Sequence, residues 1–254
     1  MKDLYILEVK RLLKQKFIWL FILGFSVAVY AYSYLLTTPE LYDMLNVNPA
    51  EASSAKFPEF MLRFYAITVG PLFMTFITSI YINEDRISGM LKQPLLHGKT
   101  RKDILNSKFI ALWGLNGFMM IAIYLITYFF AFSKWGNEIF IIPQYAITLQ
   151  KFLLISFSMI PMQALIILVS LYSRNAVVLM GMMFCILMLD SLICANLNGF
   201  ANIFMFNYST HYYLIINKEN ADVFFKLKGF IYDLVFAILF YYLAVRKMDK
   251  IEMN

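Results

Sequence analysis

Six apolar segments, each about 17 to 24 residues long, constrain the fold more than any other feature of this sequence. An α-helix rises about 1.5 Å per residue, so about 20 residues cross a hydrocarbon core of about 30 Å. The pattern therefore predicts an all-α membrane protein with six transmembrane helices, in which residues 1–254 form a single transmembrane domain. The expected spans are residues 17–36, 61–82, 109–132, 152–172, 176–197 and 229–245.

The composition supports this interpretation. Hydrophobic residues make up 61% of the chain and charged residues 15%, whereas a soluble domain has about 45–50% and about 25%. One globular core cannot bury an excess of that size. Cys185 and Cys194 fall within one expected span and indicate no disulfide framework, and His97 and His211 are too far apart to suggest a metal cluster. The charged start of the chain does not resemble a cleaved signal peptide.

The distribution of lysine and arginine predicts the orientation. Of 22 such residues, 15 fall on the side that carries residues 1–16, 83–108, 173–175 and 246–254. Cytoplasmic loops are enriched in Lys and Arg, so both termini and the 83–108 segment are expected in the cytoplasm. The net charge of +6 is then a signal of topology, and no nucleic-acid partner is expected.

Three further features concern the local structure of the expected helices and loops. Residues 1–16 form a basic amphipathic segment, which is typical of a helix lying in the membrane interface. Pro71 falls within the second span and predicts a kink there, and Pro161 lies near the middle of the fourth span. Residues 198–228 are too polar to cross but apolar enough to dip into the outer interface, so we expect a re-entrant-like segment.

The strongly basic interval 83–108 joins the second and third spans. Ile87, Met90, Leu91 and Leu95 recur at helical spacing, which predicts a short amphipathic helix within 84–97. Pro94 interrupts or ends this helix, and Gly98 allows the chain to turn. Thr100 and Asp103 have the spacing of a capping box, so a second helix is expected to begin there. A solvated loop with some helix is the alternative on pattern alone.

This arrangement resembles the membrane subunit of ABC exporters of the type-2 permease family, which includes antibiotic, bacteriocin and polysaccharide exporters. The resemblance covers the basic interfacial helix, the six spans and a cytoplasmic loop between spans two and three. That loop in the family has an acidic residue, a glycine, a leucine, a proline, an arginine and a closing lysine. The matching residues here are Glu84, Gly89, Leu91, Pro94, Arg101 and Lys108. A departure is His97-Gly98-Lys99-Thr100, where the family more often has a small residue or serine before the arginine.

The resemblance implies that this loop is a coupling helix that docks on a separate ATPase subunit, with Asp85, Arg86 and Met90 in the same contact. The partners implied are an ABC ATPase dimer, a second permease chain (identical or related) and membrane lipid. The sequence has no G-x-x-x-x-G-K-[ST] phosphate loop. The chain is therefore expected to be no enzyme and to bind no cofactor, with ATP and Mg in the partner. The expected location is the cytoplasmic membrane of a bacterium.

Polar residues inside the expected spans are candidates for a pathway. Asp190 lies deep in the fifth span, where an aspartate costs about 2.5–3.5 kcal/mol and usually faces a cavity or a partner. Gln163, Asn116 and Asn196 are further candidates, although such residues more often form hydrogen bonds between helices. A structural hydrogen bond is the alternative for Asp190.

The resemblance implies export of a hydrophobic or amphipathic substrate, with an antimicrobial peptide as the first expectation and roles in antibiotic resistance or immunity. Small drugs and lipid-linked molecules remain open. A second hypothesis is a non-transporting receptor or immunity protein that sequesters a peptide and needs no ATPase. An intramembrane enzyme is disfavoured because Asp190 has no evident partner for acid–base chemistry and neither histidine lies in a span.

Overall fold

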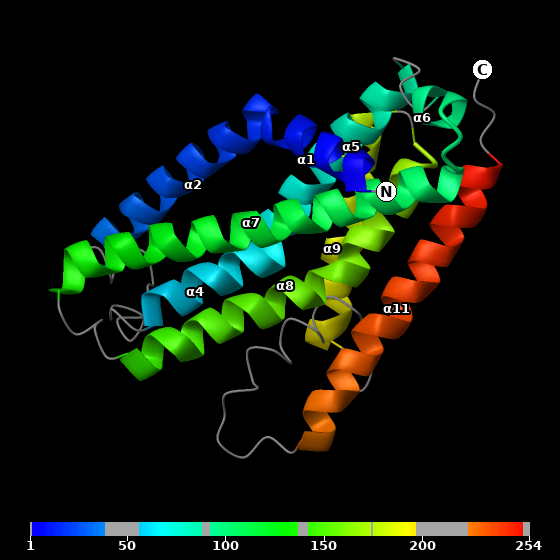
Figure 1. The fold of residues 1–254 in the computed structure, drawn as a ribbon. Helices are drawn as coiled ribbons and strands as arrows, with labels where there is room; N and C mark the ends of the chain where they lie inside the picture. The colour runs from blue at the N-terminus through cyan, green and yellow to red at the C-terminus, as the bar shows by residue number, and fades with distance from the viewer. Residues whose placement is uncertain are drawn as a thin grey trace.

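A computed structural model describes residues 2–38, 56–87, 92–136, 142–173, 175–196 and 223–250. Every element in these ranges is helical, which confirms the expected all-α class (Figure 1). The elements are α1 (Lys2–Leu13), α2 (Lys16–Leu35), α4 (Lys56–Phe64), η2 (Tyr65–Val69), α5 (Gly70–Ile87), α6 (Lys92–Leu96), α7 (Arg101–Trp135), α8 (Ile142–Ser170), α9 (Ala176–Asn196) and α11 (Val223–Asp249).

Each of the six expected spans overlaps a described helix. Two of the described helices, α2 and α7, are long and apolar enough to cross a membrane. Shorter apolar stretches lie in α8 and α9, at Ile155–Ser170 and Ala176–Leu189. The described part of the chain thus contains two helices that meet the length and composition of a span, and helices at the other four expected positions.

Several described helices extend beyond the apolar stretches that the sequence predicts as spans. The helical stretch that contains the second expected span, 61–82, begins at Lys56, and α5 continues to Ile87. The helix after the 83–108 interval begins at Arg101 and ends at Trp135, beyond the expected 109–132. Hydrophobicity marks the part of a helix that lipid can cover, but a capped helix continues through polar residues wherever packing supports it.

The sequence predicts a kink at Pro71, and the structure has a π-helical segment shortly before this residue. Five residues, Tyr65–Val69, have π-helical geometry immediately before Pro71, and the Gly70 N–H donates to the Tyr65 carbonyl. Proline has no N–H to donate to the carbonyl four residues earlier, which favours such a local change. A Cβ at position 70 would lie 2.9 Å from the Tyr65 ring and carbonyl, so this close approach requires glycine. In α8, Pro161 lies inside the helix.

The helices pack around a core contributed mainly by η2, α5, α7 and α8. α7 contacts α1, α2, α4, α8 and α11, and α8 contacts α4, α5, α7, α9 and α11, so these two helices lie at the centre of the described bundle. Aromatic stacking joins α2 to this core, with the rings of Phe21 and Phe73 3.8 Å apart. Fully buried side chains include Tyr65, Met74, Ile77, Tyr81, Leu112, Met119, Ile155 and Ile166.

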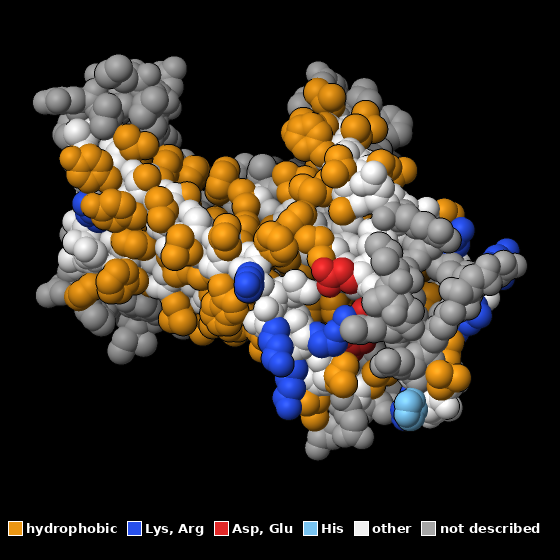
Figure 2. Space-filling view, turned by 90° about the horizontal axis from the view of Figure 1, so that it is seen from above, with side chains coloured by type: hydrophobic (Ala, Val, Ile, Leu, Met, Phe, Trp, Pro, Cys, Tyr) orange, Lys and Arg blue, Asp and Glu red, His pale blue; other side chains and the backbone are white. Residues whose placement is uncertain are grey.

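The ends of the helices separate into two groups. The helix α1, the short helix α6, the start of α7 and the end of α11 lie at one end of the molecule, and the end of α7 lies at the other (Figure 1). Figure 2 shows the molecule from above, relative to the view of Figure 1. Hydrophobic side chains cover the side of the surface over α2, and Lys and Arg gather toward the opposite side. The exposed side chains of α2 include Trp19, Leu20, Leu23 and Val27, and soluble monomers rarely expose a continuous apolar surface of this kind.

Candidate functional site

A buried cluster of charged residues joins α1 to the two helices that flank the 83–108 interval. Arg11 of α1 and Lys108 of α7 both form ion pairs with Asp85 of α5. Glu8 of α1 lies 3.3 Å from the Arg11 guanidinium and 3.2 Å from the Lys108 ammonium. The Tyr81 hydroxyl donates a hydrogen bond to Glu8. We call Glu8, Arg11, Tyr81, Asp85 and Lys108 the ion cluster.

Helical spacing explains why α1 and α5 each contribute two groups to this cluster. Glu8 and Arg11 are three residues apart on α1, and Tyr81 and Asp85 are four apart on α5, so each pair lies on one helical face. The Lys108 ammonium lies 4.0 Å from the centre of the Tyr81 ring, and the Arg11 guanidinium lies 5.4 Å from it. Both cations therefore receive a cation–π contact in addition to their carboxylates.

Because the ion cluster is buried, the stability of the protein depends on the balance of its charges. The exposed fractions are 1% for Asp85, 2% for Lys108 and 3% for Glu8. Two carboxylates and two cations balance one another, which offsets the several kcal/mol that each buried ion would cost alone. The hydrogen bond to Asp85 raises the pKa of Arg11 above its ordinary value, so the guanidinium stays charged. The cluster is a fixed electrostatic link between α1, α5 and α7.

The described part of the 83–108 interval has the predicted turn and cap. His97 and Lys99 donate backbone hydrogen bonds to the Pro94 carbonyl, and Gly98 has a φ of 75°, which favours glycine. Thr100 and Asp103 form the predicted capping box: the Thr100 hydroxyl accepts from the Asp103 N–H at 3.1 Å, and the Asp103 carboxylate accepts from the Thr100 N–H at 3.0 Å. The start of α7 is therefore fixed at Arg101.

The amphipathic helix expected within 84–97 is only partly described. The structure gives α6 as Lys92–Leu96, whereas Gly89, Met90 and Leu91 lie outside the described residues. Glu84 is exposed and accepts a hydrogen bond from Gln15 at 3.3 Å. Arg86 lies on α5, and its side chain is outside the described residues. On α6, Leu95 packs partly against the core.

Leu96 of α6 is a strongly exposed apolar side chain in this region. It is 84% exposed, more than any other large hydrophobic residue that the structure describes. It lies beside polar residues on a five-residue helix, next to the exposed His97 and Lys99.

Arg101 connects the same region to the carboxyl end of α11. Its guanidinium donates to the Met248 carbonyl at 3.0 Å and to the Asp249 carbonyl at 2.7 Å. The last carbonyls of a helix lack partners within the helix, and a cation there is favoured by the helix dipole. The Tyr241 hydroxyl also donates to Asn106, one further link between α11 and α7.

Arg101→Gln is therefore expected to loosen the end of α11. Loss of a charged donor from these two carbonyls should reduce local stability by about 1.5–3 kcal/mol, and hydrogen exchange in residues 245–250 should accelerate correspondingly. Hydrogen exchange with mass spectrometry measures this. Lys102→Gln, which removes an exposed charge from the adjacent residue, is the control and should leave that exchange unchanged; equal exchange in all three proteins would contradict the capping role.

The polar candidates within the expected spans have different surroundings. Gln163 of α8 is buried and donates to the Thr78 hydroxyl of α5 at 3.0 Å, so it forms an interhelical hydrogen bond. The Asn116 side chain is 2% exposed and hydrogen-bonds to none of the residues that the structure describes. Asp190 and Asn196 lie on α9, and their side chains are outside the described residues. Their pathway role stays a prediction.

The structure brings together Asp85 and Lys108 from the expected coupling residues and adds partners that sequence reasoning missed. The sequence pattern places Glu8 and Arg11 in a basic amphipathic segment and Tyr81 in a span, and it does not indicate that they meet. The one available signal was Glu8, a carboxylate within a basic segment and three residues before Arg11. Leu96 was missed because the helical pattern ran through Leu95.

Comparison with known proteins adds no assignment. No protein-family model matches the chain, and no curated protein matches it. Among the described residues, no group of three or more His, Cys, Asp or Glu side chains could hold a metal ion. The functional proposal therefore depends on the sequence pattern and on the geometry of the ion cluster and α6.

Proposed function

We propose that this protein is the transmembrane permease subunit of an ATP-driven ABC exporter, powered by a separate ATPase subunit. The observation that carries the proposal is the burial of Asp85 and Lys108 in one ion cluster with α1. These residues stand near the two ends of the 83–108 interval, so the interval is anchored on both sides to the helix bundle. The exposed Leu96 on α6 lies between the two anchors and supplies a contact for the partner.

The geometry supports a mechanical role for this region. A force applied at α6 would reach α5 and α7 together, because Asp85 and Lys108 are paired, and would carry α1 with them through Glu8 and Arg11. Packed helices shift as rigid units. Closure of an ATPase dimer against α6 would thus tilt α5 and α7, and two permease chains, identical or related, would enclose one pathway between them.

The chain itself is proposed to hydrolyse no ATP. Gly98-Lys99-Thr100 matches the last three positions of a phosphate loop, but Gln93 occupies the position of its first glycine. The residues before Gly98 also form α6 and a turn, whereas a phosphate loop follows a strand and leads directly into a helix. We therefore propose that ATP and Mg bind to the partner subunit.

The proposed substrate is a hydrophobic or amphipathic molecule, with a peptide as the first choice. Exposed apolar side chains on α9 and α11 provide a surface for lipid or for a second permease chain; they include Val177, Val178, Met182, Leu192, Ile231, Leu234 and Ile238. Among the described residues, the exposed surfaces of α9 and α11 carry no set of polar groups that would select one substrate.

Co-purification tests the proposal. The full chain, tagged and expressed in its native host, should bring down an ATP-binding subunit, and the reconstituted pair should hydrolyse ATP and move a labelled peptide across vesicles. Recovery of the chain with a peptide but without any ATPase would instead identify a non-transporting receptor or immunity protein.

The proposed topology has six spans with both termini in the cytoplasm, and α7 provides a direct test. Lys102 and Ser133 are both exposed and lie near opposite ends of this one helix, about 47 Å apart at about 1.5 Å per residue. In a chain with Cys185 and Cys194 replaced by serine, Ser133→Cys should react with an impermeant maleimide in intact cells. Lys102→Cys should react only after permeabilisation, and the reverse pattern would overturn the orientation.

A further inference from the structure

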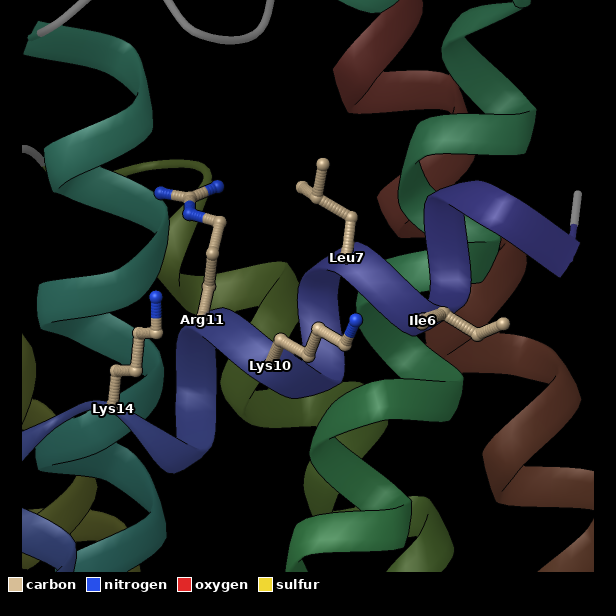
Figure 3. Close-up of a pocket in the computed structure, with 5 residues that line it drawn as sticks. All are labelled: Ile6, Leu7, Lys10, Arg11 and Lys14. Carbon is tan, nitrogen blue, oxygen red and sulfur yellow. The ribbon is translucent and has the colours of Figure 1, made fainter.

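A groove on α1 combines two exposed lysines with apolar side chains. It has a volume of about 390 Å³ and is lined by Ile6, Leu7, Lys10, Arg11 and Lys14 (Figure 3). Arg11 reaches toward α5, where the carboxylate of Asp85 pairs with it. The charge of Arg11 is therefore balanced within the ion cluster.

Lys10 and Lys14 carry charges that the cluster does not balance. They are four residues apart: Lys10 lies in the last turn of α1, and Lys14 follows directly after its end, where its backbone N–H donates to the Lys10 carbonyl at 3.2 Å. Both side chains are exposed, and within the described part of the chain neither ammonium forms an ion pair. Lys10 and Lys14 thus give the groove two positive charges that could attract an anion (Figure 3).

A second groove, between α1 and α7, is apolar. Its volume is about 210 Å³, and it is lined by Tyr5, Val9, Leu12, Leu13, Ala111, Gly114, Leu115 and Phe118. Ile6 and Lys10 of the basic groove and Leu13 of the apolar groove follow one another at four- and three-residue spacing, so these three residues lie along one edge of α1. The chemistry of the basic groove suits an anionic head, and that of the apolar groove suits an apolar chain.

We propose that α1 binds an anionic phospholipid, with the phosphate between Lys10 and Lys14 and one acyl chain passing Leu13 into the groove between α1 and α7. α1 leads directly into α2, so if α2 crosses the membrane, α1 lies at the level of the lipid headgroups. The inference rests on this part of the proposed function, the crossing of the membrane by α2 and α7, and is independent of export. A soluble phosphate compound would use the lysines and leave the apolar groove empty.

Trp19 provides a local probe for this site. Its indole N–H donates to the Leu13 carbonyl at 2.9 Å, and its ring lies 6.2 Å from that of Phe118. Both of these residues line the apolar groove. With Trp113 and Trp135 replaced by phenylalanine, the fluorescence of the full chain reports on Trp19 alone, because the sequence has three tryptophans.

The experiment measures quenching of Trp19 by lipids brominated on their acyl chains. The protein is reconstituted into two series of phosphatidylcholine vesicles. One series contains increasing mole fractions of brominated phosphatidylglycerol, and the other contains increasing mole fractions of brominated phosphatidylcholine. We expect the anionic lipid to quench at a several-fold lower mole fraction. Each basic residue near an anionic lipid contributes about fivefold in affinity, so Lys10→Gln with Lys14→Gln should raise the half-quenching mole fraction by up to about 25-fold.

Two matched variants separate a site from general attraction. Lys10→Arg with Lys14→Arg keeps both charges and should retain the preference. Lys99→Gln with Lys102→Gln removes the same charge from exposed positions outside the groove and should also retain it.

Equal quenching by the two brominated lipids would overturn the lipid site while leaving membrane insertion supported. Equal loss of preference in both glutamine pairs would also overturn the site, because it would indicate attraction to net charge. Absence of quenching by either lipid would contradict the membrane placement of α2 and, with it, the proposed function.

Discussion

Lys108→Met is expected to destabilise the protein by about 3–5 kcal/mol, the largest effect on stability that the structure predicts. Lys108 is 2% exposed and pairs with both Glu8 and Asp85. Its removal leaves two buried carboxylates facing the single guanidinium of Arg11, and an uncompensated buried charge costs about this much. For a chain of this length the unfolding temperature should fall by on the order of 10 °C.

A double-mutant cycle shows whether charge balance is the cause. Glu8→Gln combined with Lys108→Met leaves one carboxylate and one guanidinium, Asp85 and Arg11, while the Tyr81 hydroxyl can still donate to the amide at position 8. The double variant should therefore be more stable than the sum of the two single losses predicts, by about 0.5–3 kcal/mol.

Thermal unfolding of the purified chain in detergent, followed by intrinsic fluorescence, measures these four proteins. Lys102→Met is the matched control, since it removes an exposed lysine from the first turn of the same helix and should change stability by no more than about 0.5 kcal/mol. Additive losses in the cycle would mean that Glu8 and Lys108 act independently, contrary to the geometry.

Leu96→Asp is expected to abolish most of the binding of the ATPase partner without destabilising the permease. Leu96 is 84% exposed, so its replacement removes no internal packing. If the side chain is buried against the partner, its loss costs about 1.5–3 kcal/mol, which weakens binding by about 10- to 150-fold, and the new carboxylate adds a desolvation cost. The variant should therefore fold normally and lose coupled ATP hydrolysis.

Co-purified ATPase and permease-stimulated ATP hydrolysis measure this effect, and the unfolding temperature of the isolated permease checks its folding. Leu96→Met conserves volume and should retain binding. Ser133→Lys, an exposed change near the opposite end of α7, should also retain it. Normal binding by Leu96→Asp would exclude α6 as the docking helix, even if an ATPase is present in the complex.

The sequence by itself determined the features that depend on neighbouring residues. The apolar segments predicted helices at all six positions, and the described helices overlap each of them. The capping box of Thr100 and Asp103 and the turn at Gly98 were predicted correctly because each depends on residues within three or four positions. The irregularity before Pro71 was also local in origin, since proline removes a hydrogen bond from its own helix.

Only the tertiary structure decided which charged residues are buried together. Glu84 and Asp85 are adjacent in sequence, yet Glu84 is exposed whereas Asp85 is 1% exposed and bound to Arg11 and Lys108. Glu8 and Asp85 are separated by 76 intervening residues, and no periodicity within either helix specifies which face meets the other. The packing of α1 on α7 sets this choice, because a buried carboxylate persists only where another part of the chain supplies its cation.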